Sequence, residues 1–251
     1  MMVPVSGGEV WAEDTGGNGP PLVLLHPGWG DSTIWDAVMD RLPSRYRVIR
    51  HDIRGYGKSP APVSPFTQLA DLMAVLDHCE VPPAAIVGHS GGGGTAIGLA
   101  LAAPERVSAL MLLAPGVPDY PWPQDDPFGQ EFDALFAKND RAGLAQLGLR
   151  TWAAAGADPA ARAQVYGAVD AFFRQGDFER QDPPAYDYLS RIQVPVLVVL
   201  GDREYPMVRN CGEQIAARIP GARQVLIPGA DHLLPLRAPG EIAKLVSQNI
   251  P

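Results

Sequence analysis

The stretch AIVGHSGGGG, residues 85–94, places an apolar run, a histidine, a serine and four consecutive glycines within ten positions. Glycine and serine together also form flexible linkers and phosphate-binding loops, so composition alone leaves the role of this stretch open. A third interpretation is a tight strand-to-helix turn that exposes the serine hydroxyl. The residues on either side, and the order of motifs along the chain, distinguish the three.

Short apolar runs alternate with helical patterns along the chain. Several runs are apolar throughout, as expected for strands buried on both faces of a parallel sheet. The repeated order of strand and helix predicts an α/β fold, a mostly parallel sheet with helices on both faces. The predicted strands are 22–25, 47–50, 84–88, 109–113, 195–200 and 223–227, and the predicted helices lie near 33–42, 66–79, 91–103, 209–219 and 237–248.

One segment interrupts this order. Residues 118–190 contain no convincing strand pattern, and alanine, aspartate, proline and aromatic residues dominate there. The segment begins with the irregular PDYPWPQDDP and continues with helical spacing. We therefore predict that 1–117 and 191–251 form one core and that 118–190 is a helical insertion into it.

The overall composition makes several classes of protein poor candidates. A net charge of -8 with no basic cluster makes nucleic acid a poor partner. Hydrophobic residues are 46% of the chain, which predicts a sizeable core rather than disorder. Cys79 and Cys211 match no metal-binding spacing, and no run reaches the ~18 apolar residues of a membrane span. With no signal-peptide pattern at the N-terminus, we expect a cytoplasmic protein without membrane partners.

Ser90 follows a predicted strand and precedes a predicted helix, at the sheet edge where open α/β folds bind ligands. A tight turn at this point needs small residues two positions before and after the serine. Gly88 and Gly92 meet that need and give the pattern G-x-S-x-G. A phosphate-binding P-loop is excluded because no lysine follows the glycines.

Two weaker interpretations of the glycine run stay open. Gly91, Gly93 and Ala96 formally fit the dinucleotide-binding pattern G-x-G-x-x-A. However, two strands precede it, and Glu105 is poorly placed to bind a ribose. The other interpretation is a glycine-rich turn with an idle serine.

His232 is the expected general base. A serine nucleophile needs a base at neutral pH, and hydrolases of this architecture carry serine, acid and histidine in that order. Of five histidines, only His232 follows Ser90, directly after the last predicted strand. The acid is expected on the loop after the preceding strand, where Glu204 and Asp202 compete. Neither Ser90 nor His232 is expected to belong to the core.

Two further loops end at the same sheet edge. HPGWG, residues 26–30, follows the first predicted strand, and its amides are suited to form an oxyanion hole with the amide of Gly91. His26 is expected to brace this loop rather than act as a base. In the next loop, we expect Asp52 and Arg54 to support loop structure rather than perform chemistry.

In four motifs the sequence resembles the α/β-hydrolase superfamily, above all its small single-domain esterases and lactonases. The resemblance implies an α/β-hydrolase fold, with an eight-stranded, mostly parallel sheet and a helical cap inserted after the sixth strand. It also implies a cofactor-independent and metal-independent enzyme that hydrolyses a carboxylic ester or lactone through an acyl-enzyme on Ser90. The motifs are HPGWG (26–30), DIRGYGKS (52–59), GHSGG (88–92) and GADH (229–232).

The oxyanion loop departs from the family pattern. Pro27 replaces the glycine that usually follows the histidine. This leaves Gly28 and Trp29 as alternatives for the second oxyanion donor beside Gly91.

The acid departs from the pattern as well. The usual position, three residues after Gly201, holds Glu204 instead of aspartate, and Asp202 stays an alternative. Carbon–carbon bond hydrolysis, thioester hydrolysis and a ligand-binding protein or receptor on the same scaffold also remain open. The sequence predicts a small-molecule substrate without naming it, and it predicts no oligomeric state.

Overall fold

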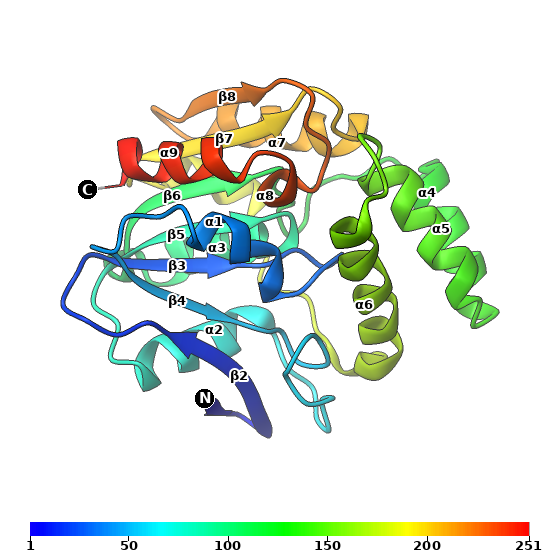
Figure 1. Ribbon diagram of the computed structural model, residues 1–251, viewed down its shortest axis with the longest axis horizontal. Helices are drawn as coiled ribbons and strands as arrows, with labels where there is room; N and C mark the ends of the chain where they lie inside the picture. Colours follow the sequence, from blue (N-terminus) through cyan, green and yellow to red (C-terminus); the bar gives the residue numbers. More distant parts are fainter. Residues whose placement is uncertain (251) are drawn as a thin grey trace.

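Eight strands form one sheet in the order β1-β2-β4-β3-β5-β6-β7-β8 (Figure 1). The computed structural model describes residues 1–250 and pairs β1, β2 and β4 antiparallel and all other neighbours parallel. The predicted α/β fold with a mostly parallel eight-stranded sheet is therefore confirmed. The strands are β1 (Met2–Val5), β2 (Gly8–Asp14), β3 (Pro21–Leu25), β4 (Arg47–His51), β5 (Ala84–His89), β6 (Val107–Leu113), β7 (Val196–Gly201) and β8 (Arg223–Ile227).

Helices cover both faces of this sheet (Figure 1). α1 packs against α8 and α9, whereas α2 packs against α3, so the two groups form separate layers. Three more helices, α4 to α6, lie between β6 and β7 in the chain and beyond the carboxyl ends of the strands. The helices are α1 (Asp36–Met39), α2 (Gln68–His78), α3 (Gly91–Ala102), α4 (Pro127–Ala137), α5 (Arg141–Trp152), α6 (Pro159–Gln175), α7 (Pro206–Arg218), α8 (Leu234–Arg237) and α9 (Pro239–Asn249).

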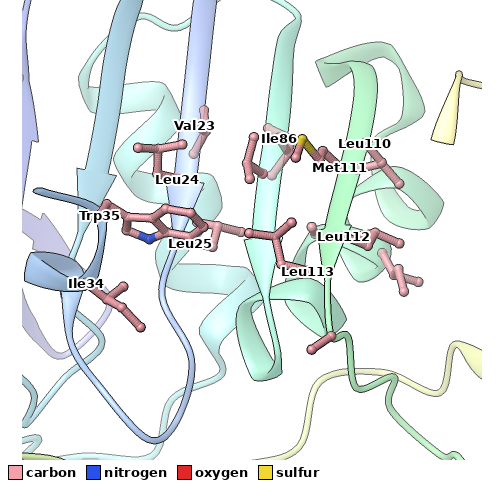
Figure 2. Close-up of a cluster of buried hydrophobic side chains, with 14 of the residues drawn as sticks. Val23, Leu24, Leu25, Ile34, Trp35, Ile86, Leu110, Met111, Leu112 and Leu113 are labelled. Carbon is pink, nitrogen blue, oxygen red and sulfur yellow. The ribbon is translucent and has the colours of Figure 1, made fainter. Parts of the chain in front are cut away.

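The centre of the sheet is buried on both faces. Every residue of β5 and of β7 is buried, which explains why their sequences are apolar throughout rather than alternating. Side chains of β3, β5 and β6 belong to one buried cluster, which Trp35 and Ile34 of the following turn join on the β3 side, as Figure 2 shows. Such packing makes the sheet a rigid support for the loops that follow its strands.

The structure corrects two details of the predicted elements. β1 and β2 were not identified as strands because they lie at the edge and alternate, with Val3, Val10 and Ala12 as their fully buried residues. The helix predicted near 33–42 is instead a 3₁₀ turn, Ser32–Trp35, followed by the four-residue α1.

Aspartate caps explain the composition of the helical segment 118–190. Each of its three α-helices begins after an aspartate whose side chain accepts backbone N–H groups: Asp126 for α4, Asp140 for α5 and Asp158 for α6. Proline occupies the first position of α4 and α6, where its missing N–H costs nothing. Among residues 1–250, no helix combines the length and apolar character that crossing a bilayer requires.

Candidate active site

The turn after β5 is possible only with glycine on both sides of Ser90. A Cβ atom on Gly92 would lie 2.7 Å from the carbonyl oxygens of Leu25 and His26, and one on Gly88 would lie 2.4 Å from the Gly92 oxygen. Ser90 itself has φ 53° and ψ -115°, in the left-handed half of the map that residues with a Cβ rarely adopt. The chain thus reverses sharply between strand and helix with the serine at the apex.

Backbone hydrogen bonds hold this strained turn in place. The Ser90 N–H donates to the Leu113 carbonyl at 2.9 Å, and the Ser90 carbonyl accepts from Gly93, Gly94 and Gly116 at 3.0 to 3.3 Å. α3 begins at Gly91, whose N–H is one of the unpaired donors at a helix start. The turn therefore presents a half-buried hydroxyl beside an available amide.

The loop after β3 lies against the same turn. A Cβ atom on Gly91 would lie 3.7 Å from the Gly28 nitrogen, so these two backbones are close neighbours. The Trp29 side chain extends into an aromatic cluster, with its ring centroid 4.9 Å from that of Phe172. The HPGWG loop thus lies directly beside the start of α3, the residue after Ser90.

His26 braces this loop, as predicted. Its Nδ1 donates to the Pro27 carbonyl at 2.8 Å and its Nε2 accepts from the Ile53 N–H at 3.0 Å, partners that assign the Nδ1–H tautomer. Asp52 and Arg54 also act as the sequence predicts. Asp52 accepts backbone N–H groups from two loops at 2.8 Å, and Arg54 forms a buried ion pair.

His232 and Glu204 form a buried pair. His232 Nδ1 lies 3.0 and 3.1 Å from the two Glu204 carboxylate oxygens, and the Tyr205 N–H fixes that carboxylate at 2.8 Å. Because Nδ1–H donates to a carboxylate, Nε2 carries the free lone pair of the neutral ring. Within residues 1–250, His232 Nε2 is buried and makes no hydrogen bond, with Ser90 or with any other residue, so its lone pair is unpaired.

Asp202 lies elsewhere on the same loop. Its side chain is exposed and its Oδ1 accepts from the Gly229 N–H at 2.7 Å. The structure thus brings Glu204, and not Asp202, to His232.

His89 links the serine turn to the histidine loop. Its Nε2–H donates to the His232 carbonyl at 2.7 Å, and the two rings lie 5.1 Å apart between centroids. The pKa of His89 lies well below its usual value. The main cause is its complete burial, and the nearby His232 lowers the pKa further. One expectation is wrong here: His232 belongs to the core, with 1% of its surface exposed, because rings and loops cover it on several sides.

A cavity of about 360 Å³ opens at Ser90, a size typical of small-molecule sites. Its wall comes both from core loops and from the segment 118–190. Trp152 connects this wall to the His232 loop, because its ring centroid lies 4.6 Å from that of His232. The lining residues are Trp29, Ser90, Gly116, Trp122, Asp126, Phe128, Gly129, Trp152, Tyr205, Met207 and Val208.

A second hollow of about 290 Å³ adjoins the first and shares Gly116 and Trp122 with it. Its lining includes Gly91 but not Ser90, so the serine hydroxyl opens into the first cavity. Across the part of the chain that the structure describes, no three histidine, cysteine or carboxylate side chains are grouped as a metal site requires.

The fold and the strained serine turn define an α/β hydrolase. The profile of the alpha/beta hydrolase family matches residues 22–245, from β3 into α9. The chain therefore belongs to the alpha/beta hydrolase family.

Comparison with individual proteins places this chain near esterases and lactone-degrading enzymes. It is 30% identical to the pimeloyl-[acyl-carrier protein] methyl ester esterase of Nitrosomonas europaea over 241 residues, which cover 87% of this chain and 91% of that protein. Its structure resembles Est816, an N-acyl homoserine lactone degrading enzyme, with a TM-score of 0.81, 26% identity and all of both chains covered. A hydrolase from Pseudomonas aeruginosa PA01 has a TM-score of 0.81 and 28% identity, with 100% of this chain and 97% of that chain covered.

Proposed function

We propose that this protein is a cofactor-independent serine hydrolase that cleaves a small or medium carboxylic ester or lactone. The observation that carries the proposal is the buried pair of His232 and Glu204, in which His232 Nε2 stays unpaired. A hydrogen bond from His89 to the His232 carbonyl connects this loop to the serine turn. In known triads a carboxylate orients the base in this way, and we propose that His232 then serves Ser90 as its nucleophile.

The chemistry follows from these positions. Ser90 Oγ attacks the substrate carbonyl while His232 Nε2 takes its proton, and Glu204 stabilises the imidazolium that forms. His232 then gives this proton to the alcohol oxygen as the bond between that oxygen and the carbonyl carbon breaks. The alcohol departs, and the acyl group stays bound to Ser90. A water molecule activated by His232 hydrolyses this acyl-enzyme and restores the serine.

The oxyanion that forms during each attack needs two aligned donors. The Gly91 N–H is unpaired at the start of α3, and the positive end of the helix dipole favours negative charge there. We assign the second donor to the Gly28 N–H, because Gly28 is the neighbour of Gly91 in the opposite loop. The Trp29 N–H is the alternative.

The segment 118–190 serves in this proposal as a cap on a core formed by 1–117 and 191–251. Trp122, Phe128 and Trp152 come from this segment and line the cavity that contains Ser90. The cap therefore contacts the substrate and leaves the chemistry to the core. Esters and lactones are proposed as substrates because relatives of this chain carry such activities in their names.

A fluorophosphonate probe tests the mechanism directly. We expect it to label the wild-type protein at Ser90 and to leave Ser90→Ala unlabelled. A panel of esters, lactones and thioesters, assayed with the same two proteins, then identifies the substrate class. Ligand binding without labelling or turnover would overturn the proposal and indicate a receptor on the hydrolase scaffold.

A further inference from the structure

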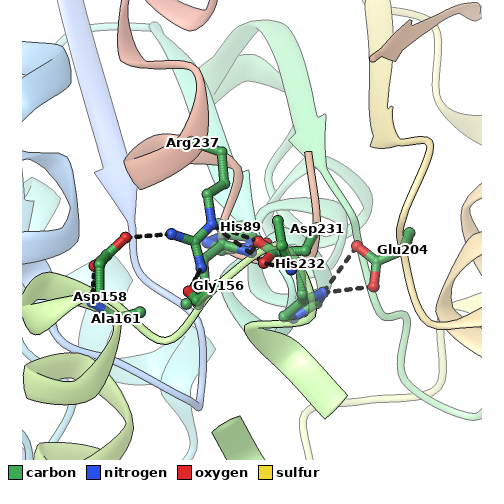
Figure 3. A network of polar contacts seen from close by, with 10 residues as sticks. His89, Gly156, Asp158, Ala161, Glu204, Asp231, His232 and Arg237 are labelled. Atoms are coloured by element: carbon green, nitrogen blue, oxygen red, sulfur yellow. Dashed lines mark hydrogen bonds and ion pairs between the residues drawn. The ribbon is translucent and has the colours of Figure 1, made fainter. Parts of the chain in front are cut away.

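A polar network centred on a buried carboxylate joins the His232 turn to the loop between α5 and α6, residues 153–158 (Figure 3). Its centre is Asp231, which is completely buried. The Asp231 carboxylate accepts from the Ala155 N–H at 2.8 Å, from the Leu233 N–H at 3.1 Å and from Arg237 Nε at 3.0 and 3.1 Å. One side chain thus fixes both the turn that carries His232 and a loop of the segment 118–190.

Arg237 extends the network to the start of α6. Its Nη1 donates to Asp158 at 2.5 Å and its Nη2 donates to the Gly156 carbonyl at 2.5 Å. Burial alone would lower the pKa of Arg237, but the hydrogen bonds and charges of Asp231 and Asp158 raise it. Because Asp158 also caps α6 through the Ala161 N–H, one guanidinium connects the core to that helix.

The anchored loop directly follows a wall of the substrate cavity. Trp152 is the last residue of α5, so the position of the loop sets the position of its ring. That ring lies 4.6 Å from the His232 ring and 4.8 Å from Phe128, between centroids, and it lines the cavity at Ser90. A shift of the loop would move this wall relative to the base.

Stability alone is a weak reason for such a group. A buried carboxylate loses its hydration, and apolar side chains of similar size often stabilise a core as well or better. Every hydrogen bond of the Asp231 carboxylate is directional and ends on the histidine turn, on Arg237 or on the loop 153–158. The arrangement therefore specifies one relative position of two segments.

We propose that Asp231, together with Arg237, is a positioning residue that docks the loop 153–158 and Trp152 onto the His232 turn. In this way it sets how large a substrate group the cavity accepts. The inference rests on the proposed ester hydrolysis for its effect on selectivity, whereas the anchoring of the loop is independent of any substrate.

The first measurement is a selectivity ratio, the kcat/KM for 4-nitrophenyl hexanoate divided by that for 4-nitrophenyl acetate. The ratio does not depend on how much of a variant is folded, so a merely structural loss leaves it unchanged. Asp231→Asn keeps the side-chain size but removes the charge, and we expect the ratio to change about tenfold, mainly through KM of the larger ester. Arg237→Lys keeps the positive charge, so we expect it to change the ratio less than Asp231→Asn does.

Asp170→Asn is the matched control. It removes an exposed ion pair with Arg141 at 2.8 Å, also within the segment 118–190, but touches neither the loop 153–158 nor the cavity. We expect its selectivity ratio to equal that of the wild type. An equal change in this control and in Asp231→Asn would overturn the inference.

The second measurement is amide hydrogen exchange in peptides that cover 153–158, made without substrate. Loss of the Asp231 carboxylate should increase exchange there in Asp231→Asn and not in Asp170→Asn. Unchanged exchange would overturn the anchoring, and faster exchange with an unchanged ratio would overturn the role in selectivity. A wild-type protein inactive on every ester would overturn the proposed function instead, and exchange would still decide whether Asp231 anchors the loop.

Discussion

The core and the segment 118–190 contribute to one cavity but are built differently. The serine turn follows β5, in which every residue is buried, and backbone hydrogen bonds fix its apex. α4 contains no fully buried residue and contacts its surroundings largely through aromatic rings such as Phe128 and Phe132. In the proposed mechanism the reacting groups therefore lie on the rigid core, and the less buried segment supplies part of the substrate cavity.

The core half of this comparison is tested most strongly by removing the proposed nucleophile or base. Ser90→Ala and His232→Ala should each lower kcat/KM by roughly 10³ to 10⁶, and the double variant should be little worse, because the two act as a unit. Assays of purified variants on the best ester of the panel measure this.

Ser90→Ala and His232→Ala should differ in thermal stability. Ser90 is half-buried at a surface turn, whereas His232 is 1% exposed and contacts Trp152 and His89, so only His232→Ala should lower Tm clearly. Retention of more than about a tenth of wild-type activity by Ser90→Ala would contradict the serine mechanism, since such substitutions cost far more in known triads.

The next largest effect concerns the two carboxylates of one loop. Glu204→Gln removes the acceptor that orients His232, and a wrong tautomer costs on the order of 10⁴ in turnover in the best-studied triad. Asp202→Asn is the matched control. Among the described residues the Asp202 side chain bonds only the exposed Gly229 N–H, so the loss of activity should stay within about tenfold. Steady-state kinetics of both variants decide the matter, and the reverse ranking would give the role to Asp202.

The sequence already predicted much of this arrangement. Apolar strands such as β5 and β7, and the glycines around Ser90, are local signals that a single chain displays. The order of Ser90, Glu204 and His232 indicated the site because parallel strands end at one edge of the sheet. The edge strands β1 and β2 were missed because half of their side chains face solvent.

Contacts between distant segments were not predictable in this way. Asp231 meets Ala155 across 76 residues, and His89 meets His232 across 143. No local pattern encodes such a pairing. A charged residue directly before the expected base was the one available sign, and only the fold shows that it is buried.

The cap half of the comparison is tested with two phenylalanines of α4. Phe128 lines the cavity, whereas Phe136 stacks on Phe173 and does not. Phe128→Ala should change the ratio of kcat/KM between a large and a small ester by about tenfold, a value typical of altered hydrophobic pockets. Phe136→Ala should leave the ratio unchanged, and an equal shift in both would contradict the assignment of Phe128 to the substrate.

The smallest expected effect is a loss of stability in mild acid. It concerns the core alone, because all five histidines lie outside 118–190. Burial lowers the pKa of His51 to about 3 and that of His89 well below 6.5, so both stay neutral when folded and take up protons when unfolded. Stability is therefore lost as pH falls through the unfolded value near 6.5. We expect about 1 kcal/mol less unfolding free energy at pH 6 than at pH 7.

Urea unfolding at the two pH values measures this loss, and His51→Gln should reduce it by about half. Burial raises the pKa of the Glu179 and Asp182 carboxyls, which stabilises the fold in more acidic solution and is why the comparison stops at pH 6. Equal stability at pH 6 and pH 7 would show that the two histidines are accessible to protons in the folded protein.

The strained backbone at Ser90 costs stability that the protein could recover at this position only by losing the proposed nucleophile. A residue with a Cβ atom at φ 53° and ψ -115° stores strain of about 1–3 kcal/mol, which glycine would relieve. A search for thermostable variants that ignored activity would therefore favour glycine at position 90 and remove the proposed nucleophile. Stability gained at other positions does not remove Ser90. Variants that are both thermostable and reactive should therefore keep the strained serine at position 90.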